Sequence, residues 1–159
     1  MYKYFWKSFS PFSNWYKAFF HFEGETFSCM EQYMMWKKAL LFKDEDVANE
    51  IMQTNNPKEI KELGRKVKNF NDKKWNEVKY EIVKSGIREK FKQNPQIKRN
   101  LLNYVGYTFV EASPFDRIWG IGYDEENAPK NIPKWGENLL GKALTEICAE
   151  LYSVEKNKK

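Results

Sequence analysis

Helix start and stop signals recur between residues 28 and 104, and they constrain the fold more than any other feature of the sequence. Residues whose side chains cap helices precede several stretches of good helix formers. Asn56, Pro57 and Glu59 show the pattern most fully, because they supply a cap, a first-turn proline and a capping-box glutamate. The other predicted helix starts are Ser28, Asp44, Asp72 and the residues just after Asn94-Pro95.

Strand-forming segments lie near the two ends of the chain. Residues 2–6 and 19–28 are rich in aromatic residues, and Glu23-Gly24-Glu25 supplies a turn within the second segment. Residues 107–112 are a further strand candidate, and a last helix is expected over 137–152. The sequence therefore predicts a mainly helical α+β domain with a small β-sheet.

Length and composition favour one globular domain. A chain of 159 residues fits one domain, so we expect residues 1–155 to form it and 156–159 to be a lysine-rich, frayed tail. Six Trp, nine Tyr and twelve Phe argue against disorder. The net charge of +5 favours anionic ligands but lacks the dense basic stripe of a dedicated nucleic-acid binder.

Cysteine and histidine usage leaves little material for metal chemistry. Cys29 and Cys148 match no metal or redox spacing, and His21 is the single histidine, so we expect no metal and no cofactor. The N-terminus lacks the pattern of a signal peptide, and no run approaches about 18 apolar residues. These features predict a cytoplasmic protein without membrane contact.

Glu31 and Lys38 are the first candidate catalytic pair. Seven residues apart, they differ by about 20° in direction around a helix and by roughly 10 Å along it. An acid and an amine spaced in this way can flank a bound sugar. A solvated helix face is the commoner role of such a pair, so the spacing alone leaves both interpretations open.

The segment EASPFDRIWGIG at 111–122 is the most unusual stretch. Asp116 lies in a loop, where carboxylates are often catalytic, and Gly120 and Gly122 can let the backbone approach a ligand. Asp116 can equally well cap a turn. Asn138 near a helix start is compatible with a phosphate-facing helix end or with a purely structural start.

Trp75 and Arg65 each allow a structural and a substrate-binding interpretation. Trp75 begins the apolar face of a long predicted helix, which favours core packing, but an indole is also a stacking platform for a heterocycle. Arg65 follows a glycine near a helix end and is well shaped for phosphate, although a lone surface arginine is the ordinary case.

Taken in order, these segments resemble the NADAR (YbiA-like) family of N-glycosidases. The resemblance extends from about residue 8 to 152, and its ordered set of motifs is far more specific than any one of them. The matching segments are FSNW (12–15), EQYMMWKKA (31–39), NPKEIKELGRKV (56–67), KKWNEVK (73–79), KFKQNP (90–95), EASPFDRIWGIG (111–122) and WGENLLGKALTEI (135–147).

The resemblance implies an enzyme that hydrolyses the bond between C1′ of a phosphorylated ribose and a nitrogenous base. It implies catalytic roles for Glu31, Lys38 and Asp116. The substrate-binding residues expected with them are Ser13, Asn14, Arg65, Trp75, Trp119, Gly120 and Asn138. Two positions depart from the family pattern, because Gln32 replaces a common histidine and Cys148 a frequent arginine, and these departures put the substrate preference in doubt.

Two mechanisms fit these residues. Two carboxyls, Glu31 and Asp116, can stabilise positive charge on the ribose and protonate the leaving base. Alternatively, Lys38 can attack the ring-opened aldehyde of the sugar to give a Schiff base, provided that burial lowers its pKa. Lys37 is the nearest alternative lysine. Neither route needs a metal or redox cofactor.

Three alternatives concern substrate and function. The expected substrate is either ADP-ribose on guanine, including ADP-ribosylated nucleic acid, or a riboflavin-pathway pyrimidine intermediate. Besides catalysis, the chain can be a module that binds ADP-ribose or NAD without turnover, or a structural interaction domain that binds no nucleotide. The sequence predicts neither the natural substrate nor the oligomeric state.

Overall fold

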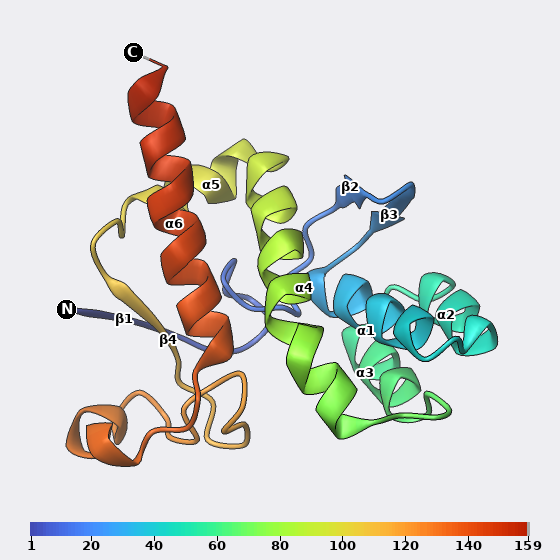
Figure 1. The fold of residues 1–159 in the computed structure, drawn as a ribbon. Coiled ribbons are helices and arrows are strands. Elements are labelled where there is room, and N and C mark those ends of the chain that lie inside the picture. Colours follow the sequence, from blue (N-terminus) through green and yellow to red (C-terminus); the bar gives the residue numbers. More distant parts are fainter. Residues whose placement is uncertain (159) are drawn as a thin grey trace. The chain divides into compact units, whose positions relative to one another are not determined.

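The structure is a computed structural model that describes residues 1–158. Figure 1 shows its helices and strands. These elements divide between two compact units of the chain. Unit 1 consists of Met1–Ser13 and the described residues from Pro95 onward, and unit 2 is the continuous segment Asn14–Asn94. Unit 1 is therefore assembled from the two ends of the chain.

Unit 2 consists of a β-hairpin and four helices. The elements are β2 (Phe20–Phe22), β3 (Glu25–Phe27), α1 (Met30–Leu41), α2 (Glu45–Met52), α3 (Pro57–Arg65) and α4 (Asp72–Lys92). Helix α1 packs against α2, α3 and α4 (Figure 1). Glycine permits two of these contacts, because a Cβ at Gly64 would collide with Met35 and one at Gly86 would lie 2.6 Å from the Tyr33 ring. Thus α1 is the helix around which unit 2 is built.

The helix caps of unit 2 agree in part with the sequence. Asp44 accepts a hydrogen bond from Val47 N, and Asn56 accepts from Lys58 N and Glu59 N, which confirms two predicted caps. The predicted caps of the other two helices were each wrong by one residue. Cys29 precedes α1 in place of Ser28, and Asn71 caps α4 in place of Asp72.

Unit 1 joins a parallel strand pair to two helices. Its elements are β1 (Tyr2–Phe5), α5 (Pro95–Leu102), β4 (Thr108–Glu111), 3-10 turns at Ala128–Lys130 and Ile132–Lys134, and α6 (Leu139–Asn157). Strand β1 pairs with β4 in parallel, so that Tyr2 lies opposite Thr108 and Phe5 opposite Glu111. Helix α6 packs on β4 and α5. Phe12 and Phe109, with ring centroids 5.1 Å apart, belong to the aromatic core of this unit.

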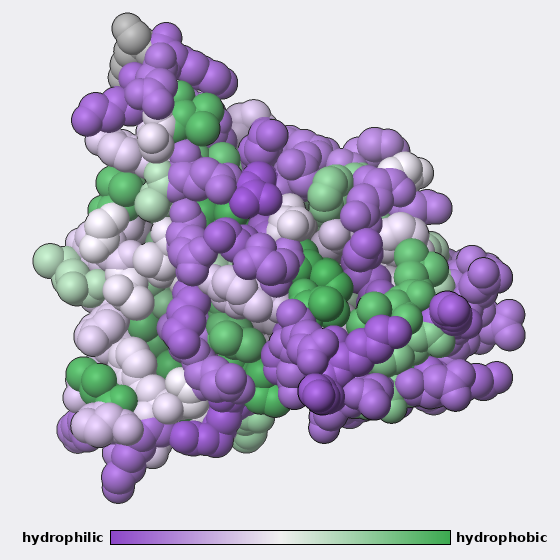
Figure 2. Space-filling view, viewed as in Figure 1, coloured by the Kyte–Doolittle hydropathy of each residue, from purple (hydrophilic) through white to green (hydrophobic). Residues whose placement is uncertain are grey.

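These elements confirm the mainly helical α+β class, with two two-stranded sheets among residues 1–158. The extent of the domain, residues 1–155, stays a prediction. Helix α6 continues through Lys156 to Asn157, and Lys159, the end of the predicted tail, lies outside the described residues. No helix in the described chain is long and apolar enough to cross a bilayer. Hydrophilic side chains cover most of the face drawn in Figure 2, with smaller apolar areas between them.

Candidate active site

Helix α1 carries both Glu31 and Lys38, as the sequence predicts. Glu31, in the first turn, is 5 % exposed, whereas Lys38, in the last turn, is half-buried. The charge on Glu31 acts on Lys38 and favours its protonated form. The pair is therefore electrostatically coupled and largely removed from water, unlike the solvated helix face that was the alternative interpretation.

The surroundings of Lys38 suit an amine that has to lose its proton. Burial is the largest influence and lowers the pKa of Lys38; the Arg65 charge lowers it further, while Glu31 and Asp72 raise it. Its Nζ lies 4.6 Å from the centre of the Phe70 ring. Among the described residues Lys38 forms no ion pair.

Lys37, the alternative lysine, differs from Lys38 because it forms an ion pair. Its Nζ is 3.1 Å from a carboxylate oxygen of Glu23. The Lys37 amine is therefore already engaged by a carboxylate, whereas Lys38 forms no ion pair among the described residues. The structure thus distinguishes two adjacent lysines that, in the sequence, differ only in their direction around the helix.

Asn14 adds an unsatisfied polar group beside the start of α1. Its backbone carbonyl accepts a hydrogen bond from Glu31 N at 2.9 Å, and its side chain is only 7 % exposed. Within residues 1–158, the buried Oδ1 of Asn14 has no hydrogen-bond partner. Because buried polar atoms are almost always paired in folded proteins, an orphaned acceptor suggests a place for a ligand donor. Ser13, the preceding residue, is also buried.

Trp75 and Arg65 lie at the ends of two helices of unit 2. Trp75 is in the first turn of α4 and only 7 % exposed, as expected of a core side chain. Arg65 is the exposed last residue of α3, and its charge acts on Lys38. Stacking by Trp75 and phosphate binding by Arg65 stay predictions.

In unit 1, Asp116 fixes the loop that follows β4. Its Oδ1 accepts hydrogen bonds from Ile118 N and Trp119 N, each at 2.9 Å, so the turn-capping interpretation is correct. The other carboxylate oxygen has no hydrogen-bond partner among residues 1–158. Capping and catalysis are therefore compatible, since one oxygen holds the loop in place while the second stays available to a substrate.

The close packing of this loop explains Gly120. A Cβ at Gly120 would lie 2.8 Å from the Glu111 carbonyl oxygen and 3.0 Å from that of Asp116. This requirement comes from the fold itself, so the glycine is no evidence for close approach of a ligand. Substrate contact by Gly120 and the half-buried Trp119 stays a prediction.

Asn138 joins this loop and β4 to the start of α6. Its side chain accepts from Glu111 N at 3.0 Å and donates to the Phe109 carbonyl at 2.9 Å. The first backbone N–H groups of α6 donate to carbonyls of the loop, Leu139 N to Ile118 and Leu140 N to Trp119. These bonds favour the structural interpretation of this helix start over a phosphate-facing one. A substrate contact by Asn138 stays a prediction.

Both departures from the family pattern have structural explanations. Gln32 is 1 % exposed; it accepts from Ser28 N and Ser28 Oγ and donates to the carbonyls of Ile51 and Thr54. Cys148 is 2 % exposed, its thiol donates to the Leu101 carbonyl, and burial raises its pKa to about 11. Gln32 ties the start of α1 to the end of α2, and Cys148 belongs to the packing of α5 on α6.

Sequence reasoning missed two neighbours of Lys38. Phe70 lies between α3 and α4 and Asp72 is the first residue of α4, and both are more than thirty positions further along the chain. No local pattern relates them to α1, because only the packing of helices in unit 2 brings them near Lys38.

The predicted site residues form two groups. Unit 2 brings Glu31, Lys38 and Arg65 into one electrostatic environment. Unit 1 holds Asp116, Trp119 and Gly120 in one loop, which is bonded to the start of α6. That both groups act on one sugar carbon stays a prediction.

Comparisons with known proteins identify relatives of this chain. The chain is 47 % identical over 147 residues to N-glycosidase R617 of Acanthamoeba polyphaga mimivirus, covering 87 % of this chain and 86 % of that protein. It is 32 % identical over 111 residues to the chloroplastic riboflavin biosynthesis protein PYRR of Arabidopsis thaliana, covering 66 % of this chain and 17 % of that one.

The fold is similar to a solved structure. The NMR structure of the E. coli protein YbiA superimposes with a TM-score of 0.80 at 25 % sequence identity, covering 99 % of this chain and 88 % of that chain. The model of the NADAR domain family matches residues 4–152, a range that includes every candidate site residue. The chain belongs to the NADAR domain family.

Proposed function

We propose that the protein is an N-glycosidase that hydrolyses the C1′–N bond between a phosphorylated ribose and a nitrogenous base. The observation that carries this proposal is the half-buried Lys38, coupled to Glu31 on one helix and held with a lowered pKa. N-glycosidase R617 of the mimivirus and N-glycosidase YbiA of Shigella boydii, which is 28 % identical to this chain, support the same chemistry.

The reaction requires charge stabilisation at two places. As the bond breaks, positive charge develops on the ribose and negative charge on the base. Glu31 stabilises the ribose cation in this mechanism, and Asp116 protonates the departing base through its available oxygen. Water supplies the hydroxyl group that C1′ gains.

Lys38 offers a covalent route to the same products. Its neutral amine attacks C1′ of the ring-opened sugar and expels the base, and water then hydrolyses the resulting Schiff base. The lowered pKa favours this route, because more of the amine is unprotonated at neutral pH. Asn14 Oδ1 is the acceptor that we assign to a donor of the bound substrate, such as a ribose hydroxyl.

The substrate is either ADP-ribose attached to guanine, free or in nucleic acid, or a pyrimidine intermediate of riboflavin synthesis. The similarity to the riboflavin biosynthesis protein PYRR of Arabidopsis thaliana and of Zea mays favours the second class. The excess of cationic side chains favours a substrate with several phosphates. Both cysteines are buried free thiols, which agrees with the cytoplasmic location that we propose.

Release of free base, measured by chromatography, tests the function and the substrate class together. Incubation with an ADP-ribosylated guanine nucleotide and with a phosphoribosylaminopyrimidine should release base from one of them. Tight binding with an unchanged ligand would instead indicate a binding module. No shift in melting temperature with either nucleotide would indicate a structural domain, because a ligand that prefers the native state raises stability.

Borohydride trapping distinguishes the two mechanisms. If Lys38 forms a Schiff base, reduction during turnover leaves a stable mass adduct on the peptide that contains it. Lys37→Ala should still form the adduct and Lys38→Ala should not. Turnover without any adduct would rule out the covalent route and leave the two carboxyls as the catalysts.

A further inference from the structure

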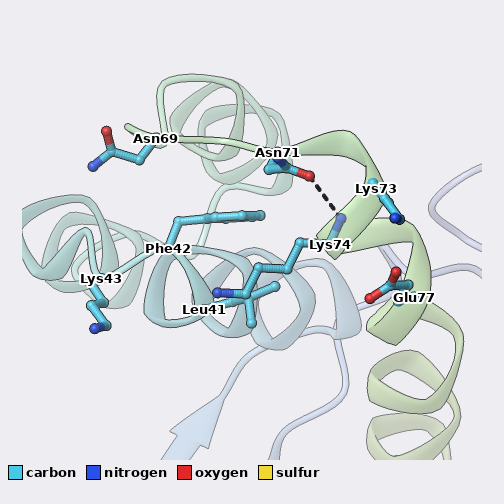
Figure 3. A pocket seen from close by; sticks show the side chains of 8 residues that line it. All are labelled: Leu41, Phe42, Lys43, Asn69, Asn71, Lys73, Lys74 and Glu77. Carbon is cyan, nitrogen blue, oxygen red and sulfur yellow. Dashed lines mark hydrogen bonds between the residues drawn. The ribbon is translucent and has the colours of Figure 1, made fainter.

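A pocket of about 540 Å³ opens between the end of α1 and the beginning of α4 (Figure 3). Its volume lies within the range of small-molecule sites, roughly 300–1,000 Å³. None of the proposed catalytic residues lines it. The lining residues are Leu41, Phe42, Lys43, Asn69, Asn71, Lys73, Lys74 and Glu77.

The lining combines an apolar base with a cationic rim. Phe42 is buried, and the Lys74 side chain extends along its ring in Figure 3, with Nζ 5.9 Å from the ring centre. Three lysines and one glutamate give the lining an excess of two positive charges. Asp72 lies at the same end of α4 and reduces that excess in part. Ammonium groups are strong hydrogen-bond donors to phosphate, so the pocket suits an anion.

Two lining residues have a backbone conformation that favours glycine. Lys43 has φ 59° and Asn69 has φ 60°, both in the left-handed region. Lys43 follows the C-cap of α1, where Asp44 N donates to the Ala39 carbonyl and glycine is the usual residue. The chain thus has polar side chains at two positions where glycine would relieve strain, as is common at binding sites.

The pocket adjoins the surroundings of Lys38. The Phe42 and Phe70 rings are 5.3 Å apart, and the Lys38 ammonium lies over the Phe70 ring. One aromatic pair therefore separates the cationic rim from the proposed catalytic lysine. A substrate whose sugar reaches Lys38 would have its phosphates or attached nucleotides within reach of the rim.

We propose that this α1–α4 pocket is a phosphate-binding subsite that holds the substrate outside the reaction centre. The identity of the ligand in this pocket rests on the proposed function. Phosphate binding itself can be measured without catalysis. The phosphate comes either from the nucleotide itself or from the backbone of an attached polynucleotide.

A pair of matched double variants tests the subsite. Lys73→Gln/Lys74→Gln removes two rim charges, and Lys58→Gln/Lys92→Gln removes two charges elsewhere in unit 2. The probes are inorganic pyrophosphate and a short single-stranded DNA without ADP-ribose, with affinities measured by calorimetry. The pocket variant should weaken binding of at least one probe by about tenfold, as expected for lost charge-assisted hydrogen bonds. The control should change it by roughly twofold or less.

The two probes identify the source of the phosphate. Loss of pyrophosphate binding alone indicates the nucleotide's own phosphates. Loss of DNA binding indicates a polynucleotide backbone. In that case the slope of log K against log salt concentration should become smaller in magnitude by about 1.4, because two phosphate contacts to a single strand are lost. Equal effects of the two double variants, or no effect of either, would overturn the subsite. Repeating the titrations with Glu31→Gln separates this inference from the proposed function, because that change should abolish turnover and leave probe binding intact.

Lys43→Gly separates binding from folding. If Lys43 serves only to end α1, glycine should leave the melting temperature unchanged or raise it, with no effect on the probes. We expect the same or greater stability together with weaker binding of the probe that the pocket prefers. Unchanged affinity in this variant would remove Lys43 from the subsite.

Discussion

At the scale of single residues, the protonation of Lys38 is the property on which the covalent route depends. Burial and Arg65 lower its pKa, while Glu31 and Asp72 raise it. Activity should therefore increase with pH as the amine loses its proton, and this increase should occur below the ordinary lysine pKa of 10.5.

Variants of the two charged neighbours should move this pH profile in opposite directions. Arg65→Gln removes a positive charge, so it should raise the pKa of Lys38 and shift the increase in kcat to higher pH. Asp72→Asn removes a negative charge and should shift it to lower pH. The measurement is kcat at saturating substrate across the pH range. Shifts of the same sign, or none, would show that Lys38 is not the titrating group.

Lys90 is a second lysine whose environment predicts a pH effect, in this case on stability. It is 1 % exposed, near the rings of Tyr16 and Phe91, and burial lowers its pKa to about 7, opposed by the Cys29 thiol. An unfolded lysine keeps the ordinary value of 10.5. Between pH 7 and 10.5 the unfolded chain therefore binds more protons, and stability should rise with pH by up to about 1.4 kcal/mol per unit.

Lys90→Met should remove this contribution. Urea unfolding at neutral and at mildly alkaline pH measures the free energy of unfolding for both proteins. We expect the wild-type protein to gain stability relative to the variant as the pH rises. Parallel pH dependences would contradict a lowered pKa for Lys90.

At the scale of elements, Gln32 connects two helices through its side chain. Gln32→Leu would leave Ser28 N–H and the carbonyls of Ile51 and Thr54 without their side-chain partner. A buried unsatisfied group costs about 1–3 kcal/mol, so the variant should lose roughly 3 kcal/mol in chemical denaturation. Gln53→Leu, at an exposed position after α2, should change stability by no more than about 0.5 kcal/mol. Similar losses in the two variants would contradict the connecting role.

Local sequence signals predict the elements well where the deciding contacts are local. Asp44 and Asn56 cap their helices because their partners lie two or three residues away. Ser28 failed as a cap because its N–H and hydroxyl bond to Gln32, whose other partners are Ile51 and Thr54, far along the chain.

The same limit applies to the candidate site. Helical spacing places Glu31 and Lys38 on one helix, but the pKa of Lys38 depends on Arg65 and Asp72, which only tertiary packing brings near. The turn-capping role of Asp116 was foreseen as one of two interpretations because its partners are adjacent. The bonds of Asn138 to β4 were not foreseen, since they join residues more than 25 positions apart.

At the scale of the whole molecule, the chain topology predicts how cooperatively the protein unfolds. Strand β1 pairs with β4, so unit 1 forms its sheet from segments that precede and follow unit 2 in the sequence. We expect one unfolding transition for the predicted domain, with equal calorimetric and van't Hoff enthalpies. Two resolved transitions in scanning calorimetry would instead show two independently folding domains.

The central claim is that Glu31, Lys38 and Asp116 are each required for cleavage of the C1′–N bond. The most direct measurement is the rate of base release by Glu31→Gln, Lys38→Ala and Asp116→Asn, with circular dichroism to verify the fold and Lys37→Ala as the matched control. We predict that each of the three changes lowers the rate by at least about a hundredfold while Lys37→Ala retains it. Full activity in all three variants would contradict the account.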